Sequence, residues 1–322
     1  MLYIPLDNRP VCYDMPKQVA KIAGINLAMP PKEILGGLTY QADFDALRDW
    51  TYNALKTNRI TSAVIALDTI AYGGLVPSRW SEDYYDDIIG RINQFLHLFK
   101  SKNINVYAFS SVMRISNNNC NEEEKEYWSE YGKLIFQYSN LYHKAQKLDT
   151  PQVQEQLTNV LQQIPDEILE DYISARERNF EINQYYVEKL KQGHFEQLVF
   201  CQDDTAKWGI NVLEADTLRN QIMQTKAQNK ALIHPGTDEI ATCLVFRAHL
   251  WPNTISVYPI YTQEDGKEIL ANYEDRPIKK SIEGQIKLCG AKKSNSIGSA
   301  DLVLLAHVPE IFQGDYIFDE EP

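Results

Sequence analysis

Short apolar runs recur along the chain, and they alternate with longer segments in which apolar residues are spaced three or four positions apart. A continuous apolar run bounded by polar residues is typical of a strand buried on both faces of a parallel sheet. The wider spacing is typical of a helix that buries one side. The runs predict eight strands, at residues 3–6, 26–29, 63–67, 105–110, 197–202, 231–233, 255–258 and 302–306.

Helices are predicted between most of these strands. The first follows Asp14, has Pro16 in its first turn and ends at Gly24, as helix start and stop signals require. Ser81 is the predicted N-cap of a long helix, and the preceding residues 69–79 are predicted to form a loop. The predicted helices cover residues 15–23, 44–55, 81–99, 213–226 and 282–288, with another that ends near residue 249.

The pattern changes between residues 121 and 192. Long polar stretches carry apolar residues at helical spacing, and breaks near residues 149–151 and 164–166 divide them into three predicted helices. About 70 residues far exceeds an ordinary connection between two strands. We therefore predict an all-α insertion over residues 121–192, between two parts of one α/β catalytic domain, residues 1–120 and 193–322.

Strands that alternate with helices favour a parallel sheet with its ligand site at the carboxyl ends of the strands. The number of strands favours a (β/α)₈-type barrel over a doubly wound open sheet. Both architectures bind ligands at the same edge.

The composition narrows the class of partner. The 322 residues include 44 acids against 32 Lys and Arg, which gives a net charge of −12, and no strongly basic run is present. Nucleic acid and anionic membrane surfaces are therefore excluded as expected partners. No apolar segment approaches the roughly 20 residues that cross a bilayer. The five cysteines are widely spaced without a C-x-x-C pair, so we expect reduced thiols in a cytoplasmic protein and neither disulfides nor a zinc site.

The candidate chemistry follows the apolar runs. Residues 197–202 end directly in Asp203 and Asp204, and two adjacent carboxylates repel unless they share a proton, a cation or a substrate. Asp7, Asp68 and Arg114 follow other runs. The predicted substrate-binding residues are Asp7, Arg9, Asp68, Tyr72, Arg79, Arg114, Arg176, Asp238 and Glu239.

Simpler roles compete with chemistry for several of these residues. Asp7 and Arg9 can form an ion pair beside a turn, and Asp238 can cap a helix. Asp204, His234 and Asp238 or Glu239 can also bind a divalent metal, although no short His spacing supports this alternative. Phosphate-binding glycine motifs and the G-x-S-x-G of serine hydrolases are absent from the sequence, so we expect no cofactor.

Several segments together resemble a bacterial family catalogued as a domain of unknown function, number 4127. They are residues 5–10, 67–68, 72–79, 175–179, 202–204 and 235–239, which are spread over essentially the whole chain. The resemblance implies a family and no activity. Members of that family have a further C-terminal region, and we expect this region to be absent from the 322 residues.

The strand that ends in Asp203 and Asp204 is also similar to the catalytic strand of O-GlcNAcase-type β-N-acetylhexosaminidases. That resemblance implies that Asp203 holds the substrate acetamide and that Asp204 is the general acid/base, with the acetamido oxygen as nucleophile. We therefore expect a retaining glycoside hydrolase acting on a small-molecule or oligosaccharide substrate. A metal-dependent hydrolase of phosphate or amide bonds and a non-enzymatic sugar- or metabolite-binding protein are the alternatives.

Overall fold

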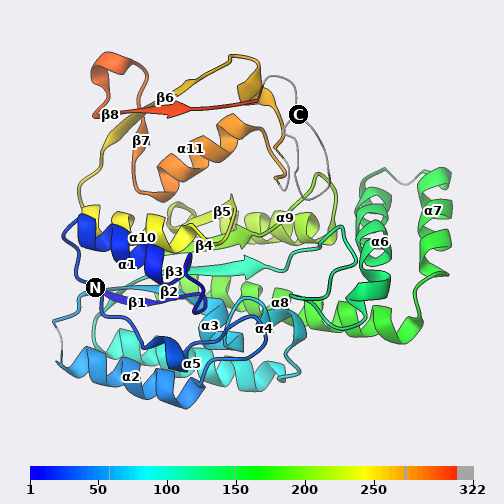
Figure 1. The fold of residues 1–322 in the computed structure, drawn as a ribbon, viewed down its shortest axis with the longest axis horizontal. Coiled ribbons are helices and arrows are strands. Elements are labelled where there is room, and N and C mark those ends of the chain that lie inside the picture. Colours follow the sequence, from blue (N-terminus) through cyan, green and yellow to red (C-terminus); the bar gives the residue numbers. More distant parts are fainter. Residues whose placement is uncertain (58, 149, 272–273, 310–322) are drawn as a thin grey trace.

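A five-stranded parallel sheet forms the centre of the molecule (Figure 1). The computed structural model describes residues 1–57, 59–148, 150–271 and 274–309. Each strand of this sheet pairs with the one that precedes it, so all five carboxyl ends lie at one edge. The strands are β1 (Leu2–Ile4), β2 (Ser62–Ala66), β3 (Asn105–Val112), β4 (Gln197–Gln202) and β5 (Ala231–Pro235).

Both faces of the sheet are covered by helices. Alternate strand residues such as Ile65 and Phe200 pack against one helical layer, and their neighbours Val64 and Val199 pack against the other. Burial of each large side chain contributes about 1.5–3 kcal/mol. The first layer contains α2 (Phe44–Thr57), α5 (Tyr85–Ser101), α8 (Asp166–Lys191) and α9 (Ile210–Met223), and the second contains α1 (Asp14–Ile22) and α10 (Ile240–Leu250).

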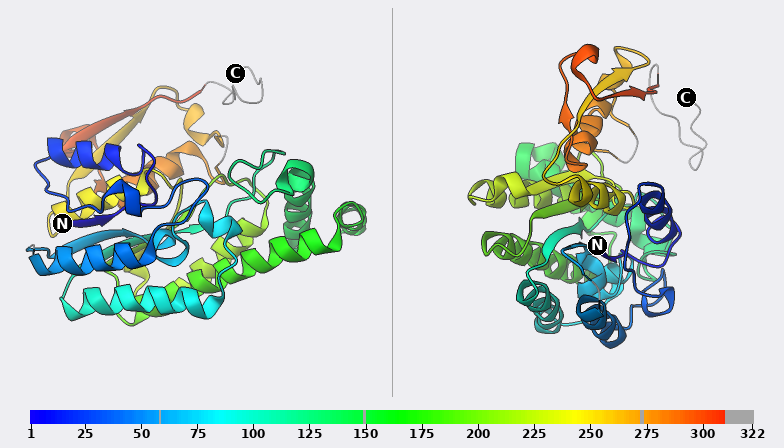
Figure 2. Two further views of the ribbon diagram at one scale, coloured as in Figure 1. Left: turned by 60° about the horizontal axis from the view of Figure 1, so that its bottom comes forward. Right: turned by 90° about the vertical axis from the view of Figure 1, so that its left-hand side faces the viewer.

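A smaller parallel sheet lies beyond the second layer, and α11 (Ile278–Leu288) lies between them (Figure 2). Its strands are β6 (Ser256–Tyr261), β7 (Lys292–Lys293) and β8 (Leu302–Ala306), in the order β7-β6-β8. The outer strand β8 exposes four consecutive apolar side chains, from 37% at Leu304 to 66% at Leu305. The parallel α/β fold is thus confirmed, with the eight described strands in two sheets. The closed barrel stays a prediction.

Three helices follow β3, as the pattern between residues 121 and 192 predicts. They are α6 (Trp128–Leu148), α7 (Pro151–Leu161) and α8. Trp128, Ile135 and Tyr172 belong to an apolar cluster of their own at the carboxyl-end side of the sheet. The second half of α8 instead packs on the sheet through Ile182 and Tyr186, so this helix joins the two regions.

Several predicted elements differ from the structure. Residues 26–29 form no strand and contribute only an isolated bridge between Ala28 and Leu2. The predicted loop 69–79 contains helical residues of α3 (Leu67–Tyr72) and α4 (Pro77–Trp80). These two helices are too short and too fully buried to show a helical period. Short 3₁₀ turns occur at Lys32–Ile34, Gln228–Lys230, Gly266–Glu268 and Ile297–Ser299.

One further predicted boundary is wrong. The helix predicted to start at Ser81 begins at Tyr85, because Ser81 instead accepts a hydrogen bond from the Asp83 N–H in the preceding turn (3.2 Å). Among the described helices, none combines the length and apolar character needed to span a membrane.

Candidate functional site

Two adjacent carboxylates and two arginines meet at the carboxyl edge of the large sheet. Asp203 and Asp204 follow β4 directly, Arg114 follows β3, and Arg79 comes from α4. Arg79 Nη2 lies 3.0 Å from Asp203 Oδ2, and Arg114 Nη1 lies 2.7 Å from Asp204 Oδ2. Asp203 and Asp204 therefore each pair with a different arginine, so they do more than cap a helix.

Two glutamates from the loop between β3 and α6 complete this cluster. Glu124 Oε1 accepts from Arg114 Nε (3.0 Å) and from Arg79 Nη1 (3.4 Å). Glu123 Oε2 lies 3.1 Å from Arg79 Nη1 and 2.8 Å from Arg114 Nη2. Neither glutamate is among the residues predicted from the sequence, because the acidic run 122–124 has the pattern of a solvated loop. We call these six residues, Arg79, Arg114, Glu123, Glu124, Asp203 and Asp204, the carboxylate–arginine cluster.

A second group joins the loops that follow β1 and β5. Arg9 donates from Nε to Asp7 Oδ2 (2.9 Å) and from Nη2 to Asp238 Oδ1 (2.8 Å). The Cys12 thiol lies 3.5 Å from Asp238 Oδ1. Since β1 and β5 are the two edge strands, this ion pair links opposite edges of the sheet at its carboxyl end.

The two groups lie within electrostatic range of each other. Asp238 raises the pKa of Asp203, and Arg9 lowers that of Glu123. Accessibility is graded across them: the side chains of Asp204 and Asp238 are 38% and 39% exposed, whereas that of Arg79 is 2% exposed. Arg79 therefore lies beneath the more accessible carboxylates of Asp204 and Asp238.

Helix α8 holds both arginines of the carboxylate–arginine cluster through the segment 175–179. Arg176 donates to the backbone carbonyls of Met113 and Arg114 and pairs with Glu214. Asn179 donates to the Ser78 carbonyl (2.7 Å), next to Arg79. Arg176 is 2% exposed, so its contacts are with the protein, and it acts on the site by fixing the backbone at Arg114.

Three other predicted substrate-binding residues lie outside the clustered groups. Asp68 is buried and accepts a hydrogen bond from the Ser111 N–H (3.0 Å). The Tyr72 hydroxyl is buried without a hydrogen-bond partner among the described residues. Glu239 accepts from Gln285 Nε2 (2.8 Å) at the start of α10. Asp7, Arg9 and Asp238, by contrast, lie in one of these groups, and Arg79 and Arg114 lie in the other.

Gly73 and Gly74 have positive backbone φ values, of 84° and 149°. A Cβ on the neighbouring Gly36 would lie 1.9 Å from the Gly73 carbonyl oxygen. The backbone of this loop thus packs directly on the segment that precedes α2, and only glycine fits at the contact.

Burial dominates the titration of the central carboxyls. It raises the pKa of Asp203 to about 6, with Arg79 and Arg114 opposing the rise and Asp204 adding to it. It raises the pKa of Asp68 to about 7 against the Ser111 hydrogen bond. Asp203 thus keeps its proton at mildly acidic pH. Asp204 beside it adopts a left-handed backbone with φ of 34°, which costs about 1–3 kcal/mol in a non-glycine residue.

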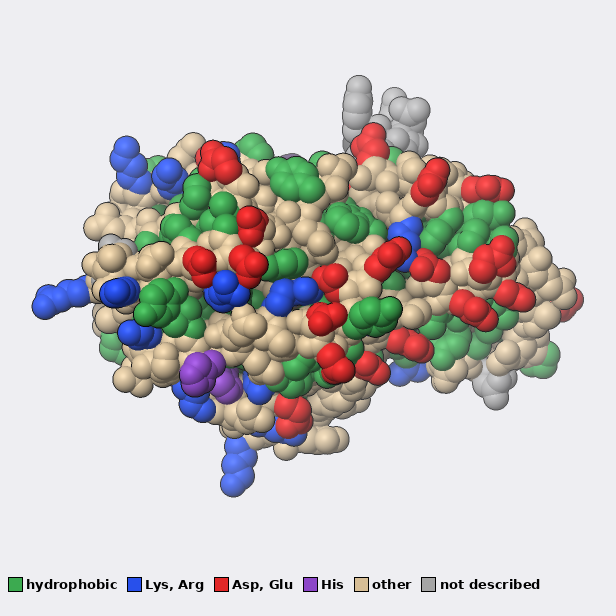
Figure 3. Space-filling view, turned by 90° about the horizontal axis from the view of Figure 1, so that it is seen from below, with side chains coloured by type: hydrophobic (Ala, Val, Ile, Leu, Met, Phe, Trp, Pro, Cys, Tyr) green, Lys and Arg blue, Asp and Glu red, His purple; other side chains and the backbone are tan. Residues whose placement is uncertain are grey.

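The charges of the site sum to an acidic total. Three arginines face six carboxylates, those of Asp7, Asp203, Asp204, Asp238, Glu123 and Glu124. Every one of the three guanidiniums already contacts at least one carboxylate. A neighbouring groove of about 490 Å³ is also rich in carboxylates, including Glu82, Glu167 and Asp171. Figure 3 shows carboxylates gathered towards the end of the molecule that carries α6 and α7.

The proposed metal ligands are not assembled. Asp204 pairs with Arg114 and Asp238 pairs with Arg9, while the buried His234 ring packs against Gly284 of α11. Within the described ranges, no three His, Cys, Asp or Glu side chains are grouped so that they could hold a metal ion.

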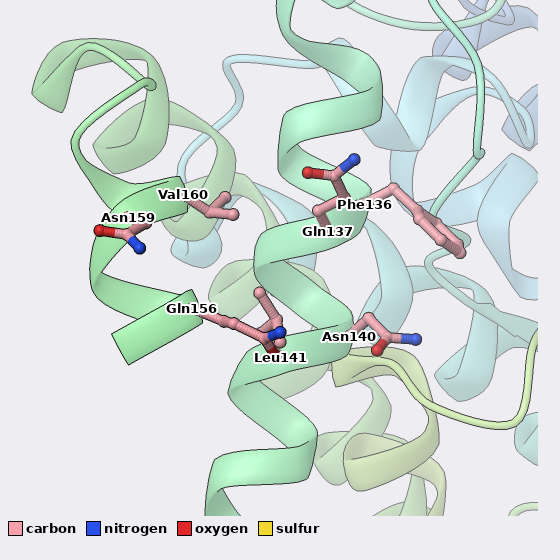
Figure 4. A pocket seen from close by; sticks show the side chains of 7 residues that line it. All are labelled: Phe136, Gln137, Asn140, Leu141, Gln156, Asn159 and Val160. Atoms are coloured by element: carbon pink, nitrogen blue, oxygen red, sulfur yellow. The ribbon is translucent and has the colours of Figure 1, made fainter. Parts of the chain in front are cut away.

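Another cavity, of about 490 Å³, lies along α6 and α7 (Figure 4). It is lined by the amide side chains of Gln137, Asn140, Gln156 and Asn159 and by three apolar residues. Phe136 and Asn140 leave α6 on the side away from α7, so these side chains do not converge on one point. No acidic or basic side chain lines this cavity among the described residues.

Comparison with known proteins places the chain in a family. The model of a family described as "Protein of unknown function (DUF4127)" matches residues 1–320. No curated protein and no solved structure matches the chain.

Proposed function

The chain belongs to the DUF4127 family of proteins of unknown function, and we propose that it is a glycoside hydrolase in which Asp203 and Asp204 are the acid–base pair. The observation that carries the proposal is the difference between these neighbours. Burial raises the pKa of Asp203 to about 6, while Asp204 is more exposed and paired with Arg114. Adjacent carboxyls whose environments separate their protonation states are the acid and base that glycoside cleavage requires.

The charges favour Asp203 as the proton donor. The resemblance to O-GlcNAcase-type enzymes implies the opposite assignment, with Asp204 as the acid. Arg79 contacts Asp203 from below and limits the rise in its pKa, so the proton is held at mildly acidic pH and can still be transferred. Asp204, which pairs with Arg114, is the partner that orients the substrate.

The reaction we propose is retaining and assisted by a substrate acetamido group. The acetamido oxygen bonds to the anomeric carbon as the bond from that carbon to the leaving oxygen breaks, and the Asp203 proton passes to the leaving oxygen. The Asp204 carboxylate accepts the acetamido N–H and stabilises the positive charge that develops there. Water then bonds to the anomeric carbon, ionised Asp203 takes its proton, and the acetamido oxygen is released.

The substrate we propose is an uncharged N-acetylhexosaminide. The site has more carboxylates than arginines, and each arginine is already paired, so a phosphate or an acidic sugar would have to displace a carboxylate. An uncharged sugar needs no such exchange, because hydroxyl groups hydrogen-bond to carboxylates and arginines without removing their charges.

The finer details of fold and location form part of the proposal. The sequential order β1 to β5 is that of a barrel wall, and the contact between Arg9 and Asp238 joins the loops of its two edges. Both features support a (β/α)₈-type barrel over a doubly wound open sheet. The free cysteines support a cytoplasmic location.

A panel of aryl glycosides tests the proposal. We expect release of the aryl alcohol from an N-acetylhexosaminide in the presence of a chelator, with kcat falling as the pH rises above about 6. Replacing Asp203 with Asn should lower kcat by about 10²–10⁴-fold, whereas Asp45→Asn, on the exposed side of α2, should leave it unchanged.

Three results would contradict the proposal. Turnover that a chelator abolishes and Mn²⁺ restores would favour the metal-dependent hydrolase. Sugar binding in calorimetry without turnover would favour a non-enzymatic binding protein. Equal kcat in the Asp203→Asn variant and the unmodified protein would remove Asp203 from the chemistry.

A further inference from the structure

Glu124 occupies the central position of the carboxylate–arginine cluster. One of its oxygens accepts from Arg114 Nε at 3.0 Å, and the same oxygen lies 3.4 Å from Arg79 Nη1 and 3.5 Å from Ser116 Oγ. The far nitrogens of the two arginines then reach Asp203 (3.0 Å) and Asp204 (2.7 Å). A single oxygen atom thus fixes the near ends of both guanidiniums whose other ends hold the aspartates.

Burial distinguishes Glu124 from its neighbour. Its side chain is 5% exposed, whereas that of Glu123, which touches the same two arginines, is 31% exposed. Interactions between charges strengthen as water is excluded, and a long side chain fixed at low exposure loses its alternative rotamers. Glu124 is therefore the more effective of the two glutamates in fixing the arginines.

We propose that Glu124 is a positioning residue, which sets the orientation and effective charge of Arg79 and Arg114 and, through them, the proton affinity of Asp203. Asp203 is faced by Arg79 from α4, Arg114 after β3, Asp204 after β4 and Asp238 after β5. Of these groups, Glu124 contacts the two that favour the ionised form of Asp203. Its negative charge offsets theirs, so Asp203 keeps its proton to higher pH than two unopposed arginines would allow.

The variants Glu124→Gln and Glu124→Asp distinguish the effect of the negative charge of Glu124 from the effect of its side-chain length. Glutamine keeps the length and can still accept from Arg114 but removes the charge, so both arginines act more strongly on Asp203. Aspartate keeps the charge but is one methylene shorter, so the contact to Arg114 is weakened. Glu122→Gln is the matched control, because Glu122 is exposed in the same loop and undergoes the same chemical change.

The test is a ¹³C NMR titration of the Asp203 carboxyl in the full chain. We expect Glu124→Gln to lower the titration midpoint of Asp203 by roughly half a pH unit or more, Glu124→Asp to lower it less, and Glu122→Gln to leave it unchanged. This readout needs no substrate, so it stands even if the glycoside hydrolase proposal, on which the kinetic role of Glu124 rests, fails.

Two kinds of result overturn the inference. One is a midpoint in Glu124→Gln that matches the unmodified protein. The other is an equal shift in Glu124→Gln and Glu124→Asp, which would indicate a general packing role. If Glu124→Gln does not fold, as judged by circular dichroism, Glu124→Asp is compared with Glu122→Gln, and equal midpoints would refute the inference. Where turnover is measurable, the pH above which kcat falls should move down with the midpoint in Glu124→Gln.

Discussion

Asp68 gives the sharpest stability prediction. Its side chain lies under the carboxyl edge of β2, is 2% exposed, and has a pKa raised to about 7 by burial. In the unfolded chain an aspartate titrates near 3.9. The folded protein therefore binds the Asp68 proton more tightly than the unfolded chain does, and the associated stability is complete below about pH 4. It is lost progressively as the pH rises through about 7.

The size of the effect follows from the shift. The pKa of Asp68 differs by about three units between the folded and the unfolded chain, which corresponds to about 4 kcal/mol of the free energy of unfolding. About 3 kcal/mol of this contribution is lost between pH 5 and pH 8. Replacing Asp68 with Asn removes this titration while keeping an oxygen that can accept from the Ser111 N–H. The change in the free energy of unfolding between pH 5 and pH 8 should therefore differ between the two proteins. We expect the decrease to be about 3 kcal/mol smaller in Asp68→Asn than in the unmodified protein.

Urea unfolding at the two pH values, followed by circular dichroism, measures this difference. Other carboxyls with raised pKa values, such as Asp203 and Glu214, titrate in both proteins, so their contributions cancel. Asp45→Asn, whose side chain is 83% exposed, should keep the difference of the unmodified protein. An equal loss of stability between pH 5 and pH 8 in Asp68→Asn and in the unmodified protein would refute the prediction.

Three further substitutions test the packing of the molecule. Arg176→Ala should lower the free energy of unfolding by about 3–5 kcal/mol in urea, because it leaves the carboxylate of Glu214 buried without its partner; a loss below 1 kcal/mol would contradict this. Gly36→Ala should cost about 1–3 kcal/mol, since its Cβ would meet the Gly73 carbonyl, and an unchanged melting temperature would show that the loop yields. Leu305→Lys should change stability by less than about 0.5 kcal/mol and reduce light scattering on concentration, whereas a large loss of stability would mean that β8 is covered in solution.

The strand-end residues could be predicted because their signal is local. Apolar runs mark parallel strands, and the carboxyl ends of such strands meet at one edge, so Asp203, Arg114 and Asp7 could be placed from the sequence. The three helices after β3 were equally visible, since each is long enough to repeat its apolar period. Local pattern also explains the main error: α3 is buried on all sides, so its sequence shows no period.

The local ion pair of Arg9 with Asp7 could be predicted, but the other ion-pair partners in the site could not, because they depend on distant parts of the chain. Glu124 contacts Arg79 from 45 positions away, and Arg9 meets Asp238 across 229 positions. Arg176 was a plausible substrate contact in the sequence, and only its burial beside Glu214 indicates that it fixes the backbone of Arg114. The pattern of apolar and polar residues thus locates the carboxyl edge of the sheet. Which charged side chains pair there is determined only in the folded chain.

The order of strands in the large sheet has a consequence for synthesis on the ribosome. Each strand pairs with the one made just before it, so the sheet can grow from one edge as the chain emerges. The helix that covers Val64 and Phe109 on the second face is α10, which follows all five strands. At a synthesis rate of about 5–20 residues per second, this apolar face stays uncovered by α10 for on the order of ten to thirty seconds. We expect nascent chains that end before α10 to bind chaperones, and chains that include it to be released.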